Sequence, residues 1–175
     1  MKRYSTYQIV LTALFAALIC VATMLIRIPI PATGGYANLG DGVILICAFL
    51  MHPLNAVIAA GLGSMLADVL AGYLTYAPGT LVIKAGVALI ALLLHDRLKK
   101  QMKPIPAMAL AGILAEAFMV LGYFVYEALC LGLGLGAAGA IAGNIGQAAV
   151  GVLVSCLASP ALGRSRELRE LLKRK

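Results

Sequence analysis

Carboxylates and a lysine inside apolar runs are the residues of this sequence whose chemistry stands out. Asp68, Lys84 and Glu116 interrupt hydrophobic stretches, while Asp41 and Glu127 lie at the ends of such stretches. Ionisable groups are expensive in apolar surroundings, so each one indicates a binding site or a structural ion pair. Hydroxyl and amide side chains that we expect near the same ends of their segments extend the candidate binding set, namely Tyr36, Asn38, Tyr73, Tyr76, Tyr123, Asn144 and Gln147.

Each ionisable residue also has a purely structural interpretation. Asp41 follows Gly40 at the start of an apolar run, where an acidic residue caps a helix as readily as it binds a ligand. Asp68 and Lys84 can neutralise each other as an ion pair. Glu116 lies deeper in its segment, where a protonated carboxyl group would bond a neighbouring helix.

Patterns for catalysis or metal binding do not accompany these residues. His52 and His95 have no carboxylate cluster beside them, and neither a nucleophile–base pair nor a phosphate-binding GxxxxGK loop followed by Ser or Thr is present. The cysteines stand singly in apolar runs, as small buried hydrophobes do. We therefore expect no catalytic residue, no metal and no cofactor, and any ATP hydrolysis would take place in another protein.

Helical spacing brings part of the candidate set together. At about 100° per residue, Glu116, Tyr123 and Glu127 fall within about 40° of one another on a helix. Asn144 and Gln147 are three residues apart and share a face of the next helix. The ionisable candidates other than Glu116 lie near corresponding ends of their segments. We expect the set to line one pocket.

The elements that must position these side chains are membrane helices. The chain is 62% hydrophobic with a mean hydropathy of +0.99, and only 12% of its residues are charged, against roughly 25% in soluble domains. Lipid must therefore be its solvent. The apolar stretches cover 5–28, 41–51, 54–72, 80–95, 105–131 and 138–162. Since a spanning helix needs roughly 20 residues, the stretch at 41–51 predicts a short helix packed inside the bundle.

The basic residues predict the orientation in the membrane. Twelve of the fourteen Lys and Arg lie before the first segment, between the fourth and fifth, or after the sixth. An even number of crossings places these regions on one face, which the positive-inside rule makes cytoplasmic. We predict one all-α membrane domain over residues 1–175, a bundle of six transmembrane helices with both termini cytoplasmic. The basic tail, about 163–175, fits a membrane anchor better than a nucleic-acid site.

Two further features concern packing. The connections on the opposite face, 28–40, 72–79 and 131–138, are rich in Gly, Pro and Tyr, and the first is apolar enough to fold back over the bundle. The first segment carries a face of small residues, to which another helix can pack closely. Packing within this bundle explains that face as well as a partner does; its members are Ala13, Ala16 and Ala17.

Four stretches of the chain resemble the substrate-binding S components of energy-coupling-factor (ECF) vitamin transporters. They are YANLGD at 36–41, GSMLAD at 63–68 with its continuation to YAPGTLVIK at 76–84, EAFMVLGYF at 116–124 and GNIGQ at 143–147. The similarity is greatest to the riboflavin-type and to the hydroxymethylpyrimidine- or pyridoxine-type branch. It implies a six-helix bundle and a vitamin pocket near the outer face, covered by the first loop.

The same resemblance implies partners. S components dock on a membrane coupling (T) component and two cytoplasmic ATPases, and the alanine motif, here Ala13 and Ala17, contacts the coupling protein. We therefore expect a vitamin-binding subunit of an ATP-driven importer in a prokaryotic plasma membrane. The absence of Trp favours a small ring, pyridoxine or hydroxymethylpyrimidine, with riboflavin as the alternative. A self-sufficient permease would need inverted repeats or a charged conduction path, and neither is visible.

Overall fold

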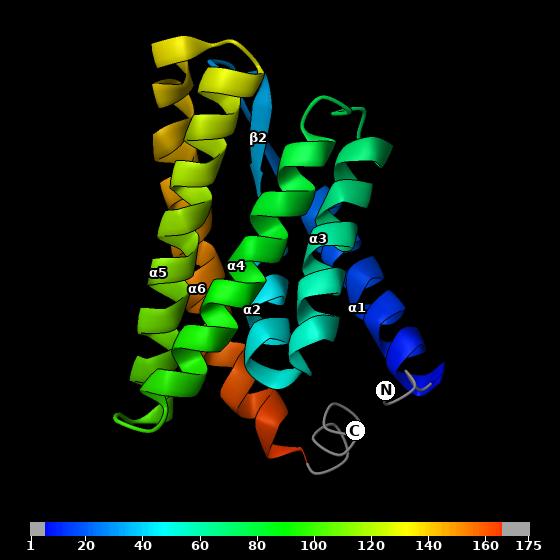
Figure 1. Cartoon of the computed structure of the whole chain (residues 1–175), viewed down its shortest axis with the longest axis vertical. Helices are drawn as coiled ribbons and strands as arrows, with labels where there is room; N and C mark the ends of the chain where they lie inside the picture. Colours follow the sequence, from blue (N-terminus) through cyan, green and yellow to red (C-terminus); the bar gives the residue numbers. More distant parts are fainter. Residues whose placement is uncertain (1–5, 166–175) are drawn as a thin grey trace.

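The structure, a computed structural model, describes residues 6–165 as a helical bundle with a small β hairpin at one end (Figure 1). Its regular elements are α1 (Thr6–Leu25), β1 (Arg27–Ile30), β2 (Gly35–Asn38), α2 (Gly40–Leu50), α3 (Pro53–Leu70), α4 (Ala77–Leu98), α5 (Pro104–Val125) and α6 (Ile141–Arg164). A π-helical turn, Tyr126–Cys130, extends α5, and a 3₁₀ segment, Gly134–Ala140, leads into α6. The predicted bundle of six helices is confirmed.

Five of the described helices are long and apolar enough to cross a membrane, and α2 is the short one. Its 11 residues span about 16 Å, roughly half of a hydrocarbon core of about 30 Å. Ile44, Leu45 and Cys47 of α2 are completely buried, which confirms a short helix inside the bundle. The strand β2 precedes α2 and runs between the helices above it (Figure 1), so the two elements together extend through the bundle.

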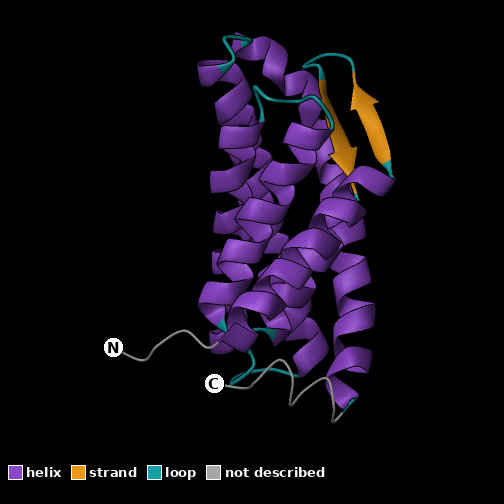
Figure 2. Ribbon diagram, turned by 90° about the vertical axis from the view of Figure 1, so that its right-hand side faces the viewer, coloured by secondary structure: helices purple, strands orange, loops and turns teal. Residues whose placement is uncertain are grey.

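The connection after α1 forms an antiparallel hairpin, which the sequence did not predict. Arg27 pairs with Asn38 at its open end and Ile30 with Gly35 next to the turn. Gly34 takes a positive φ of 71° in that turn, a conformation that glycine adopts without strain. Because Pro29 lies on an edge strand, its missing N–H costs no ladder bond. The hairpin folds against one side of the helical bundle (Figure 2).

Small residues set the distance between the first and third helices. A Cβ atom on Gly63 of α3 would lie only 2.5 Å from the carbonyl oxygen of Ala16 in α1. Ala56, Ala59 and Ala60 of α3 are completely buried. Helix pairs in membranes associate through such close backbone approaches, because lipid removes the hydrophobic driving force.

The ends of the described chain lie together. The start of α1 and the end of α6 are at the end of the bundle opposite the hairpin, and so is the connection between α4 and α5 (Figure 1). The last turn of α4 carries Arg97 and the connection carries Lys99, Lys100 and Lys103, so this end of the bundle is positively charged. The basic residues of the tail after Ser165 lie outside the described residues.

Candidate functional site

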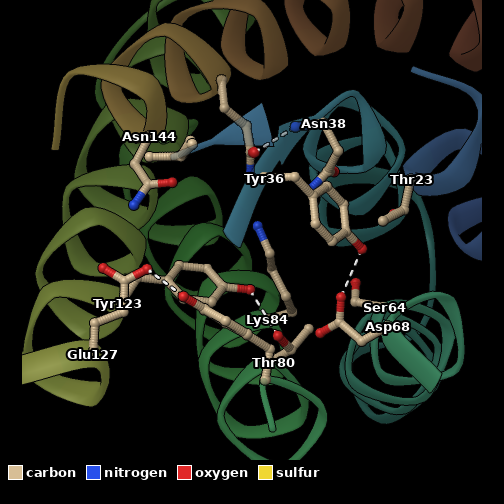
Figure 3. Close-up of a pocket in the computed structure, with 13 residues that line it drawn as sticks. Thr23, Tyr36, Asn38, Ser64, Asp68, Thr80, Lys84, Tyr123, Glu127 and Asn144 are labelled. Atoms are coloured by element: carbon tan, nitrogen blue, oxygen red, sulfur yellow. Dashed lines mark hydrogen bonds between the residues drawn. The ribbon is translucent and has the colours of Figure 1, made fainter. Parts of the chain in front are cut away.

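A cavity lies beneath the hairpin, at the end of the bundle away from the two chain ends (Figure 3). The space left within it is about 20 Å³, room for roughly one water molecule. Its walls come from α1, the hairpin, α3, α4, the α5 end with its π turn, and α6. The lining residues are Thr23, Ile30, Tyr36, Asn38, Ser64, Asp68, Tyr76, Thr80, Lys84, Tyr123, Glu127, Asn144 and Gln147.

An ion pair closes the deep side of the cavity. Lys84 Nζ lies 2.5 Å from Asp41 Oδ1, and both side chains are buried. Gln147 Nε2 donates to the second oxygen of Asp41 at 2.5 Å, and the Gln147 carbonyl accepts from the backbone N–H of Asn38 at 2.6 Å. This network joins α2, α4, α6 and the hairpin. A buried pair is tolerable when its remaining lone pairs and protons find such partners.

Two of the alternative structural interpretations of these charges were wrong. Lys84 pairs with Asp41 and not with Asp68. Asp41 lies inside α2, whose N-terminal flanking residue is Leu39, and the N–H of Gly40 at the helix start donates to Asn38 Oδ1 at 2.9 Å instead. The reason is depth: the α2 helix begins low enough in the bundle for its first acidic residue to reach the middle of α4.

A tyrosine and a carboxylate meet on the hairpin side of the cavity. Tyr36 of β2 donates from its hydroxyl to Asp68 Oδ1 at 2.6 Å. Burial and the neighbouring Asp68 raise the pKa of Tyr36 far above its ordinary value, so the hydroxyl keeps its proton. The ring of Tyr73 packs against that of Tyr36, with centroids 4.6 Å apart. The other Asp68 oxygen, Oδ2, is buried without a hydrogen-bond partner among the described residues.

A second tyrosine and carboxylate meet on the α5 side. The Tyr76 hydroxyl lies 3.2 Å from Glu127 Oε1 and 2.9 Å from the backbone oxygen of Thr33 in the hairpin turn. Burial raises the pKa of Tyr76 to about 12, so this group too remains a donor at neutral pH. Glu127 lies in the π-helical turn and is 2% exposed. Its Oε2 has no partner within the part of the chain that the structure describes.

Helix α4 supplies one wall of the cavity with its first turns. Tyr76 at its N-terminal flank, Thr80 and Lys84 are spaced four residues apart, which places them above one another on one face. The Thr80 and Tyr123 hydroxyls lie 3.0 Å apart, and Lys84 Nζ lies 5.4 Å from the centre of the Tyr123 ring. The site therefore combines hydroxyl donors, half-satisfied carboxylates and aromatic rings under a closed cover.

Comparison with known proteins decides the family. Residues 3–164 match the family described as "ECF-type riboflavin transporter, S component". The chain belongs to this family. S components are transporter subunits and not enzymes, and the apolar helices make this one a multi-pass membrane protein.

Individual proteins are also similar to this chain. The chain is 30% identical over 159 residues to the thiamine precursor transporter HmpT of Lactococcus lactis subsp. cremoris (strain MG1363), which covers 90% of this chain and 89% of that protein. It is 39% identical over 136 residues to an uncharacterized Pyrococcus woesei protein, covering 78% and 88% of the two chains. The fold matches a solved S component of a bacterial ECF transporter with a TM-score of 0.65, at 20% identity and 95% and 98% coverage.

Most of the predicted binding residues of this S component lie together. The cavity wall includes all but three of them, and the three exceptions have identifiable places. Asp41 lies behind the wall, where it forms an ion pair with the lining residue Lys84. Tyr73 packs against the ring of Tyr36. Glu116 shares its helix face with Tyr123 but lies about two turns deeper, so it does not reach the cavity.

Four lining residues escaped the sequence analysis. Ser64 and Thr80 lie four residues before Asp68 and Lys84, so the helical period that grouped the other candidates would also have found them. Thr23 near the end of α1 and Ile30 of β1 gave no such signal. Ile30 belongs to the hairpin, which the sequence did not predict.

The remaining predicted residues lie away from the cavity. Glu116 is buried at an apolar groove of about 400 Å³ between α5 and α6, and both of its carboxylate oxygens lack a hydrogen-bond partner among the described residues. Ala13 and Ala17 are exposed on the outer face of α1. Ala16 is buried against Gly63 of α3, so it serves packing within the bundle.

Proposed function

We propose that this S component binds a small pyridine or pyrimidine vitamin, pyridoxine or hydroxymethylpyrimidine, for an ATP-driven importer. The observation that carries this proposal is the set of unpaired acceptors in the closed cavity: Ser64 Oγ, Asp68 Oδ2 and Glu127 Oε2. A buried polar atom without a partner costs about 1–3 kcal/mol. A small ring that carries O–H and N–H donors would relieve this cost while its faces contact tyrosine rings.

The size of the cavity supports a small ligand. Even a ring of about a dozen heavy atoms exceeds the 20 Å³ that remains, so the hairpin and its side chains must move to admit it. Nanomolar binding requires about −12 kcal/mol, about 1 kcal/mol for each atom of such a ring. This lies below the ceiling of roughly 1.5 kcal/mol for very small ligands, provided that the ligand is almost completely buried.

The relatives support two ligands. HmpT is a thiamine precursor transporter, and thiamine contains a substituted pyrimidine ring. The family description names riboflavin, and the adjacent rings of Tyr36, Tyr73, Tyr76 and Tyr126 would suit its larger ring system. Riboflavin is therefore the alternative, although it demands a larger displacement of the hairpin.

The energy source and the partners form the second half of the proposal. The sequence contains no ATP-binding loop, so a membrane coupling (T) component and two cytoplasmic ATPases would drive transport. The exposed alanines Ala13 and Ala17 offer a smooth face for the coupling protein. We place both termini in the cytoplasm of a prokaryotic cell, because the basic residues cluster at that end of the bundle.

Direct binding tests the ligand. The chain is purified in detergent without added vitamin, any small molecule that co-purifies is identified by mass spectrometry, and pyridoxine, hydroxymethylpyrimidine and riboflavin are titrated by calorimetry. Asn144→Ala, which changes a buried cavity residue, should weaken binding at least tenfold. Ile145→Ala, next to it but 55% exposed, should not. Submicromolar binding of riboflavin alone would overturn the preference for a small ring.

A further inference from the structure

The described wall of the cavity has one cationic side chain, and its charge is already neutralised by an ion pair. Among the lining residues from the described chain, Lys84 is the one Lys or Arg, and its Nζ lies 2.5 Å from the buried carboxylate of Asp41. Asp41 is held in place by Gln147 from the other side. Arg27 of the hairpin is exposed, and its guanidinium lies over the ring of Tyr36, 6.0 Å from the ring centroid. No cationic charge of the described wall is left over for a ligand.

The carboxylates of the cavity are arranged in the opposite way. Asp68 and Glu127 lie on opposite sides of it (Figure 3). Each has one oxygen within hydrogen-bond distance of a tyrosine hydroxyl, from Tyr36 and Tyr76 respectively. Each keeps its second oxygen buried and unpaired among the described residues. The cavity thus presents hydrogen-bond acceptors on two sides, and a complementary ligand must carry hydrogen-bond donors.

A phosphate group is the wrong complement for such a wall. It carries a charge of about −1.5 to −2 near pH 7 and brings only acceptor oxygens. A buried anion is costly unless a cation or several donors pair with it, and Lys84 can leave Asp41 for it only by stranding a buried carboxylate. If Asp68 and Glu127 are ionised, their repulsion adds to this cost.

From this arrangement we infer that the site discriminates by charge: it accepts an uncharged or cationic ring that carries hydrogen-bond donors, and it rejects the phosphorylated form of the same ring. The inference rests on the proposed function, because it describes the ligand of the same cavity. It does not depend on which of the candidate rings binds. The protein would therefore take up the free vitamin and leave its phosphate ester outside.

Matched ligand pairs test this inference. Calorimetric titrations of the detergent-purified full chain compare pyridoxine with pyridoxine 5′-phosphate, hydroxymethylpyrimidine with its phosphate, and riboflavin with riboflavin 5′-phosphate. For each ring that binds, the phosphorylated form should bind at least 100-fold more weakly. Equal or tighter binding of a phosphorylated form would overturn the inference and leave the proposed function standing. If none of the three uncharged rings binds, the proposed function itself fails.

A charge variant and its matched control test the cause. Asp41→Asn releases the Lys84 charge, so the ratio of the two dissociation constants within a pair should fall at least tenfold. Asp96→Asn removes the acidic partner of Lys99 in an exposed pair at the other end of α4 and should leave the ratio unchanged. If the Asp41 variant does not fold, Glu127→Gln replaces it, because removal of a cavity carboxylate should lower the same ratio. An unchanged ratio in the folded variant would overturn the mechanism.

Discussion

Tyr36 and Tyr76 act alike on two sides of the cavity. The Tyr36 hydroxyl joins β2 to Asp68 of α3, and the Tyr76 hydroxyl joins the hairpin turn to Glu127 at the end of α5. Each side chain thus belongs both to the cavity wall and to the contacts that hold the hairpin. At the scale of single residues, we therefore expect recognition and closure to use the same hydroxyl groups.

Replacing Tyr36 with Phe should separate the hydroxyl from the ring. Asp68 then loses its 2.6 Å donor, which leaves a buried acceptor unsatisfied at a cost of about 1–3 kcal/mol. We expect roughly tenfold weaker vitamin binding by calorimetry. Tyr73→Phe is the control, because the described contact of Tyr73 with Tyr36 is between rings, and it should bind as the parent does. Equal affinities of both variants would contradict a role for the Tyr36 hydroxyl.

The Asp41–Lys84 pair predicts a strong non-additivity. Lys84→Met leaves Asp41 buried with Gln147 alone and should lower the free energy of unfolding by about 3–5 kcal/mol. The double variant Asp41→Asn with Lys84→Met removes both charges and should recover most of this loss. Thermal unfolding in detergent measures both. If the losses in unfolding free energy of the single variants Lys84→Met and Asp41→Asn simply add in the double variant, the ion pair is not the source of the destabilisation.

The residue types of the site were predictable, but their pairing was not. Burial cost marked every ionisable residue of the apolar runs as a candidate, and helical spacing grouped Asn144 with Gln147. The partner of Lys84 depends on how deep α2 sits relative to α4, and a single sequence carries no measure of that offset. Asp68, nearer in the sequence, was the wrong partner for this reason.

The hairpin and the π-helical turn are the elements that sequence periodicity did not reveal. Two prolines and three glycines in 28–40 resemble an irregular loop, yet the edge strand tolerates Pro29 and the turn requires Gly34. The π turn at Tyr126–Cys130 changes the helical register at the point where α5 meets the cavity. The long apolar helices and the short α2 followed directly from hydropathy and length.

The approach of α1 to α3 yields a prediction at the scale of elements. Gly63→Ala would bring a Cβ atom to 2.5 Å from the backbone oxygen of Ala16, so the two helices must separate and the variant should unfold at a lower temperature. Gly146→Ala in α6 is the matched control, since a Cβ there meets nothing within 4 Å. It should be neutral or stabilise the protein by up to about 1 kcal/mol. Equal melting temperatures of the Gly63→Ala variant and the parent would show that α1 and α3 can separate at this contact without loss of stability.

At the scale of the whole molecule, the charge pattern and the fold agree. The apolar stretches predicted six crossings, an even number that places the basic regions on one face, and the start of α1 and the end of α6 lie at the same end of the bundle (Figure 1). The cavity lies at the other end. The length of the bundle therefore separates the proposed vitamin site from the basic connection between α4 and α5, so we expect a partner bound at one end to act on the other through the helices.

The outer face of α1 carries a prediction about assembly. Large side chains at Ala13 and Ala17, as in the double variant Ala13→Trp with Ala17→Trp, should abolish uptake by vesicles that contain the coupling protein and the ATPases. Vitamin binding by the isolated chain should remain, because both positions are exposed and distant from the cavity. Val82→Trp, at a 68% exposed position of α4, should preserve uptake. Normal uptake by the α1 variant would exclude this face as the docking surface.

The closure of the hairpin has a consequence for time as well as for affinity. Tyr36, Tyr76 and Asn38 fasten it to three different helices or their turns, so a molecule held beneath it can escape only when these bonds open together. For a vitamin bound in this cavity we therefore expect slow dissociation, with a residence time longer than that of an open cleft of equal surface. Release would then require work from outside the chain, which the proposed partners would supply.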